Sequence, residues 1–241
     1  MNINHNISII AISDIKIKET IFALKKSSES LHPRKTILFT SKSVSLNKYD
    51  SKLIDLIRIN SIKSIKEYSE FIVYELHQYL ETSHCLIVQW DGYVCNKKKW
   101  NSNFLKYDYI GAPFIPRDSD EKYSRDKNGN FFVIGNGGFS LRSRKLLEAP
   151  KKYALKDNFT FTNFHEDGFF CVLHRKFLES KGFLWAPFYI AKDFSLESPL
   201  SFEDFKKLPL GFHGRKMLIF ISLKQKLDYL INLVRLNKYQ N

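Results

Sequence analysis

An alternation of apolar strands and helices over the first ninety residues restricts the fold of this chain more than any other feature. Short runs rich in β-branched residues at 6–13, 35–41 and 84–92 predict buried strands. Between them, residues 17–30 and 64–81 place apolar side chains three and four positions apart, which is the spacing of an amphipathic helix. This alternation predicts an α/β fold with a mainly parallel central sheet and helices on its faces.

The other segments of the chain have a less regular pattern. Residues 51–62 fit a short helix followed by a strand, and the polar segment 117–130 predicts a mobile loop. A helix is expected at 167–181, and a strand with a turn at 183–195. The tail at 215–241 has the spacing of one long amphipathic helix or of a helix pair.

The net charge of the chain bears on its partners. There are 38 Lys and Arg residues against 25 Asp and Glu residues, which gives a formal net charge of +13 at pH 7. Such an excess indicates an anionic partner, namely a nucleic acid, an anionic membrane face or a phosphorylated substrate. A surface that only keeps the protein soluble is the alternative.

The cysteines and the apolar segments bear on the compartment. Cys85, Cys95 and Cys171 are odd in number and form no CxxC pair, so neither a disulfide framework nor a structural zinc site is expected. Reduced thiols in a cytoplasmic protein fit this pattern best. The N-terminus has no basic segment before an apolar run, and no stretch of about 20 apolar residues occurs, so we expect neither a signal peptide nor a membrane span.

Two segments are suited to a ligand at the edge of the sheet. Asp91 follows a buried strand, where a carboxylate can hold a cation beside phosphates; a turn formed by Asp-Gly is the alternative. The segment GNGGFS at 135–140 has neither the spacing of a dinucleotide fingerprint nor the Gly-Lys-Ser/Thr ending of a P-loop. Its glycines would either let the backbone approach a ligand or form a hairpin turn.

Acidic and imidazole side chains supply further candidates. Glu166 and Asp167 precede an apolar helical run. One of them can take a proton from an attacking hydroxyl, or both can stabilise the start of a helix. His213, in the segment GFHG, can bind a metal as a neutral imidazole or have a structural role.

The order of these motifs adds a resemblance. The set QWDGYV, NFLKYDYIGAPF, GNGGFSLRS, HEDGFF, FSLESP and GFHG, spread over residues 65–215, resembles a bacterial family of domains of unknown function classed with glycosyltransferases. It is also similar to the wider GT-A glycosyltransferase layout, which has an Asp-x-Asp motif, a Gly-Gly loop, a Glu-Asp motif and a late metal-binding His. The resemblance implies a GT-A-like single domain that transfers a sugar from a nucleotide-sugar donor.

The resemblance implies roles for the donor-binding and metal-binding residues. Asp91 would coordinate Mn²⁺ or Mg²⁺ at the donor diphosphate, and His213 would complete that site. The motif here is Asp-Gly-Tyr instead of Asp-x-Asp, and Tyr93 cannot replace a carboxylate ligand. Basic side chains such as Arg142 are therefore an alternative way to offset the charge of the leaving group. Asp14, after the first strand, would help to hold the base and ribose.

The same resemblance implies the sugar-binding and catalytic residues. The loop residues that would face the donor or the acceptor are Asn136, Gly137, Gly138 and Phe139. Asp167, or its neighbour Glu166, would deprotonate the acceptor hydroxyl. One such base favours inversion at the anomeric carbon.

The resemblance also implies an organisation and a setting. Residues 1–214 would form the catalytic domain, with a nucleotide-binding half at 1–91 and an acceptor half at 92–214. The acceptor would be a glycan or lipid-linked glycan in bacterial surface polysaccharide biosynthesis, such as lipopolysaccharide or capsule, and the donor a UDP-sugar. The basic tail at 215–241 would lie on the anionic inner face of the cell membrane, dock on the core or form a dimer.

Two other classes of function stay open from the sequence. A carbohydrate-binding or scaffold protein on a transferase fold is compatible with the missing second Asp. A nucleic-acid-binding protein is compatible with the net charge of +13, but the basic residues are scattered and no recognition module is present, so no nucleic acid is expected as a partner.

Overall fold

The computed structural model describes residues 4–114, 125–126, 128–133, 135–156, 165–198, 207–224 and 226. The predicted mobile loop at 117–130 lies largely outside the described residues, and the tail beyond residue 226 lies wholly outside them.

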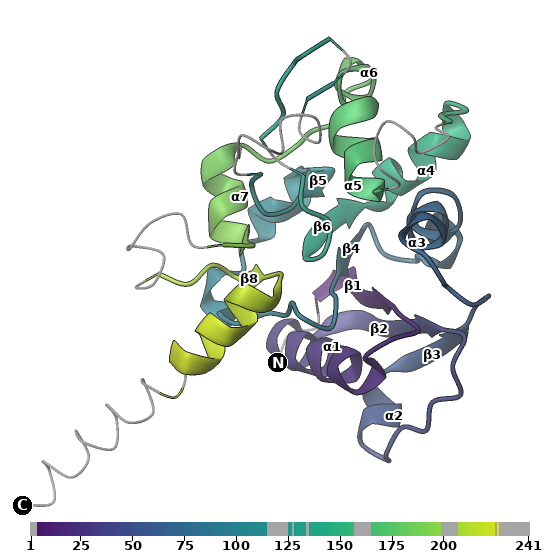
Figure 1. Cartoon of the computed structure of the whole chain (residues 1–241), viewed down its shortest axis with the longest axis vertical. Helices are drawn as coiled ribbons and strands as arrows, with labels where there is room; N and C mark the ends of the chain where they lie inside the picture. The colour runs from purple at the N-terminus through teal and green to yellow at the C-terminus, as the bar shows by residue number, and fades with distance from the viewer. Residues whose placement is uncertain are drawn as a thin grey trace, which may run out of the picture.

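A six-stranded sheet forms the centre of the molecule, with the strand order β3-β2-β1-β4-β6-β5 (Figure 1). The first four strands in this order are parallel, whereas β6 runs antiparallel to both of its neighbours. The strands are β1 (Asn4–Ile12), β2 (Pro33–Thr40), β3 (Asp55–Arg58), β4 (His84–Ile87), β5 (Tyr109–Ile110) and β6 (Ser140–Ser143). The predicted fold class, a mainly parallel α/β sheet flanked by helices, is confirmed.

Helices cover both faces of this sheet. In β2, Thr36 donates a hydrogen bond of 2.8 Å to Ser28 of α1 (Ile17–Leu31). Phe39 lies three positions further along β2, so its side chain points to the other face, where its ring centroid lies 5.4 Å from that of Phe71. Because both faces are covered, the central strand β4 is buried along its whole length, whereas the edge strand β3 is largely exposed.

The strand order reverses between β1 and β4. From β1 the chain moves outward through α1, β2, α2 (Asp50–Leu53) and β3, and then returns past β1 to β4. The segments that follow the two strands at such a reversal cross opposite faces of the sheet. They leave a crevice at the carboxyl ends of these strands, where ligands bind in α/β proteins. The fold therefore marks the ends of β1 and β4 as the place for a site.

The return to β4 is a helical segment whose hydrogen-bond pattern changes along its length. It consists of α3 (Ile65–Glu70), a π-helical turn (Phe71–Glu75) and a 3₁₀ turn (Leu76–Tyr79). The side chain of Ser64 caps its start by accepting a hydrogen bond from the Glu67 backbone. The helix predicted at 64–81 is thus present.

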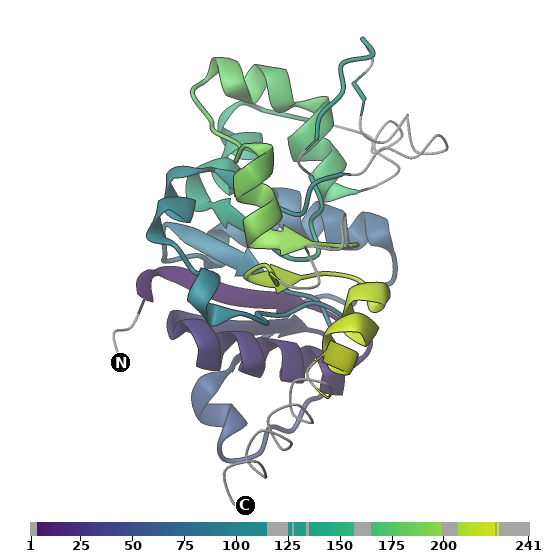
Figure 2. The same cartoon turned by 90° about the vertical axis from the view of Figure 1, so that its left-hand side faces the viewer.

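The second half of the chain contributes short elements around β5 and β6, above the parallel strands in Figure 1. They are α4 (Arg144–Lys152), α5 (Glu166–Gly168), a π-helical turn (Phe169–Leu173), α6 (Arg175–Ser180), α7 (Phe188–Phe194), β7 (Ser195–Leu196) and β8 (Gly211–Phe212). Two 3₁₀ turns (Lys97–Lys99 and Ser102–Lys106) precede β5, and residues 215–224 form a helix after β8, drawn in yellow in Figure 2. The predicted helix at 167–181 is present, with a break at His174.

The prediction of a strand at 183–195 is wrong. Pro187 precedes α7 instead, and the helix buries Ala191 and Phe194, which are three residues apart and therefore lie on one helical face. The strand predicted at 84–92 ends early, because β4 stops at Ile87 and Asp91 occupies a turn. Among the described residues, no helix has both the length and the apolar character needed to cross a membrane.

Candidate active site

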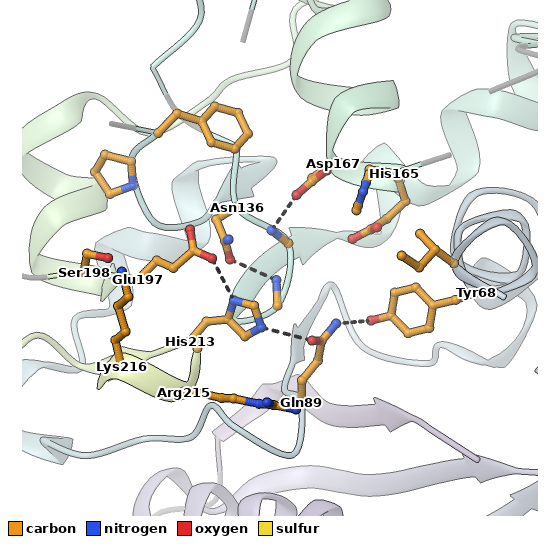
Figure 3. A pocket seen from close by; sticks show the side chains of 17 residues that line it. Tyr68, Gln89, Asn136, His165, Asp167, Glu197, Ser198, His213, Arg215 and Lys216 are labelled. Carbon is orange, nitrogen blue, oxygen red and sulfur yellow. Dashed lines mark hydrogen bonds and ion pairs between the residues drawn. The ribbon is translucent and has the colours of Figure 1, made fainter. Parts of the chain in front are cut away.

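A cavity of about 650 Å³ lies beyond the carboxyl end of β4 and faces the loop that leads into β6 (Figure 3). Segments far apart in the sequence meet around it. Its lining residues are Ile65, Tyr68, Gln89, Pro113, Phe114, Asn136, Gly137, Gly138, His165, Glu166, Asp167, Glu197, Ser198, His213, Gly214, Arg215 and Lys216. The loop, acidic pair and histidine singled out in the sequence are therefore brought together here.

The glycine loop is where these groups touch. A Cβ on Gly137 would overlap Glu166 Oε1 and would lie 2.8 Å from Nη2 of Arg142. A Cβ on Gly138 would overlap the imidazole ring of His213. Glycine is required at both positions because other side chains occupy the space of a Cβ, and neither residue has a positive φ.

The two acidic residues at the start of α5 have different surroundings. Asp167 accepts a hydrogen bond from the Gly137 backbone at 3.0 Å and another from the Gly168 backbone at 2.7 Å. Glu166 accepts a hydrogen bond of 2.7 Å from the guanidinium of Arg142, and both side chains of this ion pair are buried. The backbone thus orients the Asp167 carboxylate at the pocket, while Glu166 is held by a buried charge.

Arg142 lies behind the glycine loop and does not line the pocket. Its side chain is fully buried, donates from Nε to Ser140 at 3.1 Å, and lies 5.1 Å from the ring centroid of Tyr109. Burial lowers the pKa of the guanidinium, but the surrounding groups, Glu166 among them, outweigh this and raise it. The expectation that Arg142 offsets the charge of a leaving group does not fit this position, because Arg142 already neutralises Glu166.

Phe139 also lies away from the pocket. Its side chain is fully buried, its ring centroid is 5.4 Å from that of Phe194, and it fills the space that a Cβ on Gly211 would need. Of the four loop residues expected to face a sugar, Asn136, Gly137 and Gly138 line the cavity, and Phe139 packs in the core.

His213 lies across the pocket from Asp167 (Figure 3). Its imidazole stands between the carboxylates of Asp91 and Glu197. Its Nε2 lies 3.0 Å from Gln89 Oε1 and 3.5 Å from Asp91 Oδ1, and its Nδ1 lies 3.6 Å from Glu197 Oε1. Burial lowers the pKa of His213, but the carboxylates of Glu197 and Asp91 outweigh it and raise the pKa above its ordinary value. The imidazole is therefore biased toward its cationic form.

Gln89 connects His213 to Tyr68. Its amide nitrogen donates to Tyr68 Oη at 3.0 Å, which leaves its amide oxygen facing His213. Burial raises the pKa of Tyr68, so the hydroxyl stays neutral. Because Nε2 of His213 faces an acceptor oxygen, this chain of hydrogen bonds favours a proton on Nε2.

Asp91 and His213, the metal pair implied by the resemblance, lie close together. Asp91 Oδ1 is buried and has no hydrogen-bond partner among the residues that the structure describes, and it lies close enough to His213 Nε2 for both atoms to contact one cation. Glu197 faces Nδ1, the other ring nitrogen of His213, so its carboxylate is not placed beside Nε2 as a third ligand. Within the described residues, no group of three or more His, Cys, Asp and Glu side chains is arranged to hold a metal.

A second cavity of about 330 Å³ lies at the reversal point, between the segments that follow β1 and β4. It shares Ile65, Tyr68 and Gln89 with the main pocket, and Asp14 lies in its wall. The carboxylate of Asp14 accepts hydrogen bonds from Thr40, from the backbone and hydroxyl of Ser41, and from the Ile62 backbone. Asp14 therefore ties the end of β1 to the segments after β2 and β3.

Several lining residues were missed from the sequence. Gln89 lies in a segment with the pattern of an ordinary strand, and Tyr68 in one with the pattern of an ordinary helix. Nothing in the neighbouring sequence indicates that either residue lines a pocket. Arg215 and Lys216 directly follow the GFHG motif, and this position indicates that they could lie at the same site as His213. From the sequence alone, both are assigned to the basic tail instead. Glu197, in FSLESP, faces His213 only because β7 pairs with β8.

Comparison with known proteins gives a family and a fold. The model of the DUF5672 family, described as a protein of unknown function, matches residues 53–213. No curated protein matches the sequence. The structure is similar to that of a glycosyltransferase involved in the glycosylation of the major capsid of PBCV-1, with a TM-score of 0.52 and 14% identity over 91% of this chain and 98% of that chain.

A second similar structure is a mannosyltransferase from Pyrobaculum calidifontis in complex with GDP-Man and Mn²⁺. The TM-score is 0.40 and the identity 12%, over 59% of this chain and 46% of that chain, so the alignment spans less than half of the mannosyltransferase. At such identities, the likeness to the capsid glycosyltransferase establishes the fold alone.

Proposed function

Because the chain belongs to the DUF5672 family, a family of unknown function, we propose its activity from its site: it is a glycosyltransferase that uses a nucleotide-sugar donor. One observation carries the proposal. The cavity beyond the carboxyl end of β4 has a backbone-oriented carboxylate, Asp167, on one side and the basic groups His213, Arg215 and Lys216 on the other (Figure 3). The glycosyltransferase-like fold is consistent with this chemistry.

The basic side of the pocket suits a diphosphate. Arg215 and Lys216 begin the helix at 215–224, and neither forms an ion pair with any residue that the structure describes. The first backbone N–H groups of this helix have no partner within the helix and carry partial positive charge. These groups would stabilise the negative charge that develops on a departing diphosphate, and His213 would add its own positive charge only in the absence of a bound metal.

The acidic side of the pocket suits the acceptor. Asp167 would take the proton from the attacking hydroxyl, which lies on the face of the sugar opposite the leaving group. A base and a leaving-group site on opposite sides of one cavity favour inversion at the anomeric carbon. Glu166 is the weaker candidate for the base, because Arg142 already occupies its carboxylate.

A divalent metal, Mn²⁺ or Mg²⁺, is part of the proposal. Asp91 and His213 would hold it, and its chemistry would be to neutralise charge on the diphosphate. Binding at Nε2 would require His213 to give up its proton and its contact with Gln89. Asp14 would act as a positioning residue that shapes the smaller cavity for the base and ribose of the donor.

The division of the chain follows from the same proposal. Residues 1–91 would supply the donor side and 92–214 the acceptor side, with 215–241 as a basic tail. The donor would be UDP-linked, and the acceptor a glycan or lipid-linked glycan of a surface polysaccharide. A lipid-linked acceptor would require the enzyme to work at the membrane surface.

A donor screen tests the proposed function. The full chain is incubated with several UDP- and GDP-sugars, with and without Mn²⁺, and both nucleoside diphosphate release and thermal stability are measured. We expect one donor to raise the melting temperature and to be turned over when an acceptor is supplied. No shift with any nucleotide would contradict the proposal, and binding without turnover under every condition would favour a non-catalytic carbohydrate-binding protein.

A further inference from the structure

The helix at 215–224 has two contrasting faces. Met217 and Ile221 are four residues apart, and both are buried in an apolar cluster with Ala23 of α1, Tyr93 and Phe212. This contact fixes the rotation of the helix about its axis, so the residues on the other side must point outward.

The outward face combines apolar and basic side chains. Ile219 and Leu223 are 62% and 60% exposed, and they follow Arg215 at intervals of four residues, so the three lie along one line on the helix. Exposed Lys226 continues this face. Two large aliphatic side chains this exposed cost free energy in water unless something covers them.

The charge of this segment indicates what covers it. Residues 215–227 contain four Lys and Arg residues and no acidic residue. Aliphatic side chains flanked by cations are suited to a lipid bilayer with anionic headgroups, where the apolar groups enter the acyl region and the cations meet the phosphates. In the sequence, Leu227, Leu230, Ile231 and Val234 extend the apolar spacing.

The position of the face links it to the pocket. Arg215 lines the cavity, and Leu223 lies eight residues further along the helix, a distance of about 12 Å. Figure 1 shows the helix in yellow, leaving the body of the molecule next to β8. A surface bound along this face would therefore meet the rim of the pocket.

We propose that the outward face of helix 215–224, formed by Ile219, Leu223 and the basic residues beside them, docks on an anionic membrane and brings the pocket to the acceptor at the lipid surface. The lipid-linked acceptor rests on the proposed function, but the docking surface does not, because vesicle binding is measured without any sugar donor.

Vesicle cosedimentation of the full chain tests the docking surface. Vesicles are made of phosphatidylcholine alone or with about a third of phosphatidylglycerol. We expect wild type to bind the anionic vesicles and not the neutral ones, and the variant Ile219→Ser/Leu223→Ser to lose about tenfold or more in binding. The matched control is Leu56→Ser/Leu184→Ser, which removes two leucines that are 42% and 54% exposed outside this helix; its binding should equal that of wild type.

Three outcomes would overturn the proposal: no binding of wild type to anionic vesicles, equal binding to neutral ones, or unchanged binding of the helix variant. A change of the helix variant from dimer to monomer, with no change in vesicle binding, would identify a second copy of the chain as the occupant. The helix variant should keep wild-type nucleoside diphosphate release with a soluble acceptor, so loss of docking is distinguishable from failure of the transferase proposal.

Discussion

Glu166 and Asp167 are adjacent residues with the same chemistry, and only their contacts distinguish them. Glu166 neutralises the buried guanidinium of Arg142, whereas Asp167 is held toward the cavity by backbone N–H groups of Gly137 and Gly168. The resemblance implied Asp167 as the base, with its neighbour Glu166 as the alternative. Our proposal that Asp167 is the base rests on this difference, because a base needs an oxygen that faces the substrate.

The first prediction at this scale concerns Asp167. We expect Asp167→Asn to lower kcat by about 10²- to 10⁴-fold, because the amide cannot accept the acceptor proton. Donor affinity should stay close to that of wild type, since the substitution preserves shape and the basic groups lie on the other side of the pocket. Kinetics and calorimetric donor titration measure the two effects. Near-normal turnover would show that Asp167 is not the base, and Glu148→Gln, at an exposed acidic residue, is the control.

The second prediction concerns the buried pair. Arg142→Met should lower the free energy of unfolding by about 3–5 kcal/mol, because it leaves the Glu166 carboxylate buried without its partner. Arg144→Met, in the exposed pair of Arg144 and Glu148, should cost less than about 1 kcal/mol. Urea unfolding measures both. The double variant Arg142→Met/Glu166→Gln should recover part of the loss, and equal costs for Arg142→Met and Arg144→Met would refute a structural role for the pair.

The sequence predicted single helices correctly where the apolar spacing extends over many residues. The helices expected at 17–30 and 64–81 are present because each repeats its apolar spacing over several turns. The segment 183–195 is so short and so rich in aromatic residues that the spacing of its apolar residues does not distinguish a strand from a helix. Packing of Ala191 and Phe194 against the core decided in favour of α7.

The prediction at the scale of elements concerns Asp14, which joins the segments after β1, β2 and β3. Burial raises the pKa of its carboxyl, but hydrogen bonds from Ser41, Ile62 and Thr40 outweigh this and lower the pKa to about 2. A pKa depressed in the folded state stabilises the fold above the ordinary pKa of 3.8, and this stabilisation is lost as the pH falls toward about 2. Its upper bound is about 2.5 kcal/mol, and its size is smaller because the side chain is partly exposed.

Asp14→Asn should therefore lower stability at neutral pH by about 1–2 kcal/mol, and the difference from wild type should shrink as the pH falls from about 4 to about 2. Urea unfolding across this pH range measures it. A difference that stays constant with pH would mean that the charge of Asp14 does not hold these elements together. Asp55→Asn, at an exposed carboxylate of β3, should change little at any pH.

The whole molecule builds its pocket from both halves of the chain, and the last prediction follows from this. A nucleoside diphosphate bound there should slow hydrogen exchange at 62–68, 89–91, 136–138 and 213–216 together, because all these segments line the two adjacent cavities or contact a group that does. Exchange mass spectrometry with the nucleotide that gives the largest thermal shift measures this. Exchange at α2 and α6 should not change, and protection confined to one half of the chain would contradict a shared site.

The sequence by itself determined the parallel α/β core, because period and residue type are local properties that the chain carries wherever it folds. It also determined that Asp91, the glycine loop, the acidic pair and His213 are chemically suited to one site. Only the tertiary structure decided which of them face the cavity. Arg142 and Phe139 lie in β6 or beside it, and the side of the backbone to which each points depends on neighbours more than twenty residues away. The same holds for Gln89 and Glu197, which contact His213 only because the strand-order reversal and the β7–β8 pair bring their segments together.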